Sequence, residues 1–163
     1  MSNKTAVIGL GSTIRRDDGI GIAVLESLLG SFKREDADYL NFGTASFDLI
    51  YRLKDYDTVV LIDAIDASLK PGELKIFELN KIKLGLKSKI LSSHELDLKA
   101  LGALTKKFAI KAKIYVAGIQ VKDVSFGEGV TAQLTEKKPD IVKRIGLFVD
   151  TLFCSLFFSV FLH

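Results

Sequence analysis

Four side chains in this sequence have the types and positions needed for metal chemistry: Asp17, Asp18, Asp63 and His94. The adjacent carboxylates follow a short apolar run that predicts a strand, and Asp63 ends a second such run. His94 stands at the expected start of a helix. Because parallel strands place ligand crevices at their carboxyl ends, we expect these groups to converge. Two carboxylates and an imidazole suit a divalent transition metal and leave coordination positions open.

Each of these side chains also has a purely structural interpretation. Asp17 or Asp18 would make a good N-cap and would favour the helix dipole. Asp63 could simply start a turn, as Asp66 is well placed to do. His94 could be a polar surface residue. A metal site is therefore favoured only because these groups coincide at one predicted sheet edge.

The glycines around the two carboxylates suggest a second kind of site, for a dinucleotide. Gly9 and Gly11 match the first two glycines of that fingerprint, but Ile14 stands where the third is expected. Asp17 and Asp18 would also repel a pyrophosphate, which disfavours this interpretation. Nucleophilic catalysis has less support still, because no Gly-x-Ser-x-Gly elbow occurs and the one cysteine lies in an apolar segment.

The composition indicates a folded globular protein, with 48% hydrophobic residues and a mean hydropathy of +0.26. Its 163 residues fit a single domain spanning residues 1–163. A net charge of +3, without a basic stripe, does not favour a nucleic-acid partner. One cysteine and no recognisable secretory signal fit a reducing, cytoplasmic location.

The elements that must position these groups alternate along the chain. Strands are expected over 5–10, 38–43, 58–63, 73–79 and 110–120, and helices over 20–32, 44–53, 92–108 and from 134 onward. The connection before the fourth strand is too short for a parallel crossover, so that strand should be antiparallel and at an edge. The Lys-rich segment 80–91 should form a long loop. Together the pattern predicts a three-layer α/β/α domain with a mostly parallel sheet.

The end of the last helix is unusually apolar, because residues 147–162 are almost all hydrophobic. A helix that is apolar on every side is buried, paired with a partner or in lipid. A membrane span needs about 20 apolar residues, and this shorter run contains Asp150. We therefore favour a core or partner-covered helix over membrane contact.

Several motifs, taken together and in order, resemble the hydrogenase maturation endopeptidases. This family removes a C-terminal peptide from the precursor of the nickel-iron hydrogenase large subunit after nickel insertion. The resemblance extends over about residues 5–145. The matching segments are Gly9-Leu10-Gly11-Ser12, Asp17-Asp18-Gly19-Ile20-Gly21, Gly43-Thr44-Ala45, Asp63-Ala64-Ile65, Pro71-Gly72, Ser93-His94-Glu95-Leu96 and Gly118-Ile119-Gln120.

The resemblance implies a twisted five-stranded sheet between helices and three functional residues. The family's metal-contacting acid of the first loop falls on Asp18, its strand-end aspartate on Asp63 and its histidine on His94. The chain departs from the family pattern at Ser12, where asparagine is usual, and at Val121, where proline is usual. Neither departure removes an expected ligand.

The resemblance also implies a function: a cytoplasmic, nickel-dependent endopeptidase acting on the large-subunit precursor, with nickel delivered in that substrate. Asp18, Asp63 and His94 would engage the nickel, and Asp17 would have a supporting role. One alternative is a non-catalytic metallochaperone or binding module that holds the nickel-loaded subunit. Another is a protease of related fold with other targets. The sequence does not specify the hydrogenase, the cleavage point or the hydrolytic base.

Overall fold

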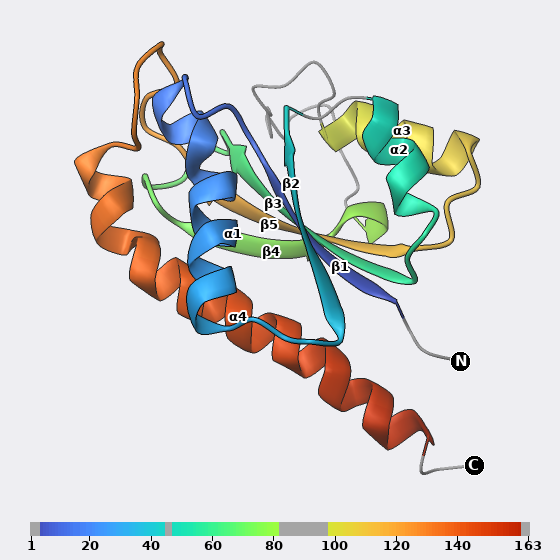
Figure 1. Ribbon diagram of the computed structural model, residues 1–163. Helices are drawn as coiled ribbons and strands as arrows, with labels where there is room; N and C mark the ends of the chain where they lie inside the picture. Colours follow the sequence, from blue (N-terminus) through green and yellow to red (C-terminus); the bar gives the residue numbers. More distant parts are fainter. Residues whose placement is uncertain (1–3, 45–46, 82–97, 161–163) are drawn as a thin grey trace.

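The core of the protein is a five-stranded sheet with the order β2-β1-β3-β5-β4 (Figure 1). The computed structural model describes residues 4–44, 47–81 and 98–160. The strands are β1 (Thr5–Leu10), β2 (Ala37–Gly43), β3 (Thr58–Ile65), β4 (Leu74–Glu78) and β5 (Lys113–Gln120). All neighbours are parallel except β4, which runs antiparallel to β5 at one edge. The predicted antiparallel edge strand is thus confirmed, as is the adjacency of the first and third strands.

Helices cover both faces of the sheet, so the predicted three-layer α/β/α fold is confirmed (Figure 1). The helices are α1 (Ile20–Ser31), α2 (Phe47–Leu53), α3 (Leu98–Lys107) and α4 (Ala132–Val160), with short 3-10 helices η1 (Arg16–Gly19) and η2 (Leu79–Lys81). One apolar cluster lies between the sheet and α1 with α4. A second lies between the sheet and α2 with α3.

The central strand β3 shows how the sequence builds these two cores. Successive side chains point to opposite faces of a sheet, and a strand buried on both faces is apolar at every position. Leu61 packs in the cluster under α2 and α3, whereas Val60 and Ile62 pack in the cluster under α1 and α4. β3 also continues to Ile65, beyond its predicted end at Asp63, because its pairing with β5 extends that far.

The two carboxylates before α1 do not cap that helix, so the N-cap interpretation of Asp17 or Asp18 is wrong. The N-cap residue is Gly19, and no side chain bonds to the helix start there. η1 holds both carboxylates instead. Further along, the first two residues of the predicted loop 80–91 belong to η2. Residues 82–91, the predicted helix start near Ser92 and His94 lie outside the described residues, and α3 begins at Leu98.

Part of the apolar end of α4 belongs to the core. Val149 and Phe153 are buried against the sheet, and Arg34 stacks 4.0 Å from the ring centroid of Phe153. The Arg34 guanidinium also pairs with Asp150 at 2.8 Å, which ties α4 to the segment before β2. Within the described residues, no helix is both long and apolar enough to cross a membrane.

The contact between Tyr56 and Asp38 makes stability depend on pH in an alkaline range. Tyr56 is 9% exposed, and its hydroxyl donates to Asp38 Oδ2 at 2.8 Å. Burial, with the help of this bond, raises the pKa of Tyr56 to about 12. A raised folded-state pKa gives stability that is complete below the ordinary pKa near 10 and is lost as the pH rises through 12.

We therefore predict that Tyr56→Phe is less stable than wild type by about 1 kcal/mol at neutral pH. Between pH 10 and 12 the wild type should lose about 2 kcal/mol relative to the variant, because only the wild type must keep a buried tyrosine neutral. Denaturant unfolding at several pH values measures this difference. Parallel stability curves for the two proteins would contradict the assignment.

Candidate functional site

The loop after β1 is folded tightly around the carboxylate of Asp18. Ser12 N donates to Asp18 Oδ2 at 2.9 Å, and Asp18 is only 1% exposed. Gly11 has φ +137°, and a Cβ there would lie 2.0 Å from the Asp18 carbonyl oxygen. Only glycine fits this turn. Because the carboxylate takes a loop N–H group that a phosphate would need, the geometry also disfavours a dinucleotide site.

The start of α1 lies directly against the ends of β1 and β3. A Cβ on Gly21 would be 2.3 Å from the Leu10 carbonyl oxygen and 2.4 Å from that of Ile62. Glycine at this position therefore lets three elements meet at one point. Asp18 precedes Gly21 by one helical turn, and Asp63 follows Ile62, so both acids belong to the same carboxyl edge of the sheet.

Asp63 is also buried, with 1% of its surface exposed. It alternates with Leu61 and Ile65 along β3, which places it on the face toward α2 and α3. Its partner in the neighbouring strand is Gly118 of β5. His94, which comes before α3 in the chain, lies outside the described residues, so its convergence with Asp63 stays a prediction.

Asp17 is a structural brace between two loops. Its Oδ1 accepts a hydrogen bond from Thr131 N at 2.7 Å, and its Oδ2 accepts from Lys122 N at 2.9 Å, Asp123 N at 3.0 Å and Thr131 Oγ1 at 3.1 Å. Asp17 has no exposed surface. A buried carboxylate of this kind is stabilised by several charge-assisted bonds. The carboxylate therefore fixes the loop that follows β5, residues 121–131, against the loop that follows β1.

Gln120 at the end of β5 holds a third loop, the one after β3. Its Oε1 accepts from Ala67 N at 2.8 Å and from Leu69 N at 3.1 Å. Its Nε2 donates to Asp66 Oδ1 at 3.2 Å and to the Val121 carbonyl at 3.0 Å. Asp66 Oδ1 also accepts from Ser68 N at 3.2 Å, which confirms the predicted Asx turn.

Sequence reasoning did not find the bonds made by Asp17 and Gln120. In each case the available signal was a polar residue at or after the end of a buried apolar run. That signal marks a position but does not identify its partners. The residues bonded to Asp17 lie more than 100 positions away along the chain.

The carboxyl edge of the sheet thus carries two buried carboxylates, Asp18 and Asp63. The loops around it are fixed by the hydrogen bonds of Asp17 and Gln120. Buried acids are costly and are concentrated at functional sites. Carboxylate oxygens are acceptable ligands for divalent metal ions. Across residues 4–44, 47–81 and 98–160, no three His, Cys, Asp or Glu side chains are grouped closely enough to hold a metal ion.

Fold and site together define a class of protein: a doubly wound α/β protein with buried carboxylates at the carboxyl edge of its sheet. A family model described as hydrogenase maturation protease matches residues 22–146. The chain belongs to this family, as the resemblance predicted. The matched range contains Asp63 and begins shortly after Asp18.

Known proteins agree with this assignment. The NiFe hydrogenase maturation protease HybD from Thermococcus kodakarensis is 27% identical and superposes with a TM-score of 0.68 over 89% of this chain and 98% of its own. HycI from the same organism, at 22% identity, shares the fold with a TM-score of 0.71, over 91% of this chain and 93% of its own.

Among sequences, the hydrogenase expression/formation protein HupD from Thiocapsa roseopersicina is 27% identical over 134 residues, which cover 80% of this chain. The chain spans 61% of the length of that relative and less than two thirds of several others. The similarity to these relatives therefore concerns the shared α/β region.

The brace made by Asp17 leads to a prediction about stability. Asp17→Asn should destabilise the protein by about 3 kcal/mol, because an amide turns a donor toward buried N–H groups that need acceptors. Thr131→Val should cost about 1 kcal/mol through loss of one hydroxyl bond. Chemical denaturation at neutral pH gives both values.

Asp140→Asn on the exposed face of α4 is the matched control, with an expected change below about 0.5 kcal/mol. If Asp17→Asn is no more destabilising than this control, Asp17 does not brace the two loops.

Proposed function

We propose that this protein is a cytoplasmic endopeptidase that removes the C-terminal peptide from the nickel-loaded precursor of the nickel-iron hydrogenase large subunit. The observation that carries the proposal is the pair of buried carboxylates, Asp18 and Asp63, at one sheet edge of a chain in the hydrogenase maturation protease family. Family membership supports peptide hydrolysis. The acid pair supports a metal-dependent recognition step.

In this proposal the nickel ion is part of the substrate. Asp18 and Asp63, together with His94, would complete the coordination of nickel already bound in the precursor. A set of carboxylate and imidazole ligands suits nickel. The segment that carries Asp18 is closed by the hydrogen bond from Ser12 N, and Asp63 lies within the central strand β3, so both carboxylates have a well-fixed backbone. Cleavage would then occur only after correct metal loading.

Two chemical roles are open to this site. The nickel ion could polarise the scissile carbonyl or activate a water molecule. Alternatively, one of the carboxylates could act as the general base. Asp17 is not a candidate for either role, because both of its oxygens are already occupied by the loop that it holds.

The deciding experiment mixes the protein with nickel-loaded and nickel-free precursor and follows the size of the large subunit. We expect shortening of the nickel-loaded precursor alone. Asp18→Ala, Asp63→Ala and His94→Ala should each slow cleavage by about 100-fold or more, the scale of an acid-base or Lewis-acid contribution. Asp140→Asn on the exposed face of α4, which keeps all three residues and the hydrogen bonds of Asp17, is the control and should cleave at nearly the wild-type rate.

Two results would contradict the proposal: no nickel-dependent shortening, or full activity in Asp18→Ala and His94→Ala. A stable complex with an uncut precursor would instead identify the protein as a metallochaperone or binding module.

A further inference from the structure

Two loops at the carboxyl edge form one rigid surface, which we call the loop pair: residues 12–16 after β1 and residues 122–130 after β5. Arg16 N donates to the Gly127 carbonyl, and Gly127 N donates to the Ile14 carbonyl, each at 3.0 Å. Asp17 N donates to the Asp123 carbonyl at 3.1 Å. Figure 1 shows the two loops side by side, beyond the carboxyl end of β1. Together with the Asp17 carboxylate, these bonds join segments that are far apart in sequence.

The loop pair presents two large apolar side chains to solvent. Phe126 is 79% exposed and Ile14 is 61% exposed, and Phe126 is the most exposed large apolar residue in the described part of the chain. The hydrogen bond from Gly127 N to the Ile14 carbonyl and the bridge between Arg15 and Gly127 join the two backbone segments that carry them. Arg15 further restrains Phe126, because its guanidinium carbon lies 5.7 Å from the ring centroid. A single exposed apolar residue is normal on a protein surface. Two such residues on hydrogen-bonded loops next to the candidate site indicate a binding surface.

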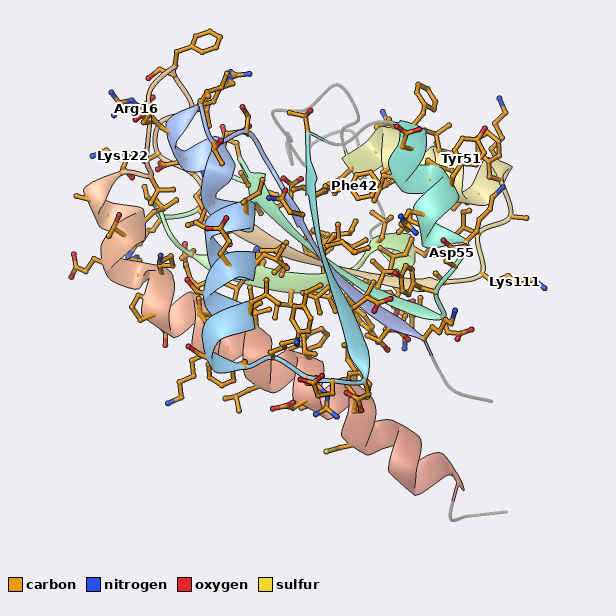
Figure 2. The ribbon with its side chains drawn as sticks, in the orientation of Figure 1. Arg16, Phe42, Tyr51, Asp55, Lys111 and Lys122 are labelled. Carbon is orange, nitrogen blue, oxygen red and sulfur yellow. The ribbon has the colours of Figure 1, made fainter. Side chains whose placement is uncertain are left out.

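The position of this pair relative to the acids points to its partner. Ile14 precedes Asp18 in the short segment that joins β1 to α1, so a polypeptide that reaches Asp18 along this edge runs beside Ile14. The loop pair carries more basic than acidic side chains: Arg15, Arg16 and Lys122 are basic, whereas Asp123 and Glu128 are acidic. Arg16 and Lys122 lie together at this end of the molecule (Figure 2).

We infer that Ile14 and Phe126 are specificity residues that contact an apolar segment of the precursor, flanked by a carboxylate, next to the peptide bond to be cut. This inference rests on the proposed function and names the surface that recognises its substrate. Aromatic anchors of this kind dominate protein interfaces. Bracing by Asp17 makes the surface preorganised, which lowers the entropy lost on binding. Asp17 is thus a positioning residue for recognition.

The test compares cleavage kinetics of nickel-loaded precursor by wild type, Phe126→Ala and Tyr51→Ala. Tyr51 is the matched control: it is 61% exposed, aromatic, and lies on α2 at the opposite side of the molecule (Figure 2). Phe126→Ala should raise KM by about tenfold with kcat within about twofold, the effect of losing a contact anchor. Tyr51→Ala should leave both constants unchanged.

Two additional variants exclude a simple loss of folding. Phe126→Leu should recover most of the wild-type KM, because it restores apolar contact area without the ring. Ile14→Ala should raise KM by a few-fold. Thermal unfolding of all variants should match the wild type, since neither side chain is buried.

The outcomes separate this inference from the function on which it rests. If wild type cleaves and Phe126→Ala behaves like Tyr51→Ala, the surface has no role in recognition and the proposed function is unaffected. A lower kcat for Phe126→Ala with unchanged KM also overturns the inference. If wild type does not cleave at all, the proposed function fails and the inference falls with it.

Discussion

The arrangement of the candidate site depends on one buried carboxylate. Asp17 accepts bonds from three backbone N–H groups and one hydroxyl group in the loop after β5, and it does so from within η1, beside Asp18. Without this carboxylate, these donors would lose their acceptor. With the carboxylate in place, the loops that follow β1 and β5 become a single unit. The neighbouring Asp18 accepts a hydrogen bond from Ser12 N within the segment that follows β1.

Close backbone packing provides the second constraint. Gly21 allows the start of α1 to touch the carbonyl groups of both Leu10 and Ile62, and Gly11 allows the loop to turn back onto Asp18. These contacts put an acid from the first loop and an acid from the third strand at one edge. Gln120 holds the remaining loop with its fully bonded amide group. These contacts fix the backbone around Asp18 and Asp63 in the absence of substrate, and a coordination site requires such preorganisation.

The sequence predicts those parts of this fold that depend on local pattern. The apolar runs at β1 and β3 identify buried central strands, and the short connection before β4 identifies an antiparallel edge. The true end of β3 was missed because strand length depends on the partner, and β5 continues to pair as far as Ile65. The partners of Asp17 were missed because periodicity carries no information about contacts over more than 100 residues. The choice of Asp18 over Asp17 as a ligand rests on family resemblance, and the bonds of Asp17 show that Asp17 has a structural role.

The proposed function requires Asp18 and Asp63 to become ligands of nickel carried by the precursor. X-ray absorption at the nickel edge tests it most directly, on loaded precursor alone and on precursor mixed with the protein and frozen before turnover. We predict additional oxygen scattering in the nickel shell on mixing with wild type, and less of it with Asp63→Asn. A nickel shell that stays the same with and without wild-type protein would contradict coordination of the nickel by Asp18 and Asp63.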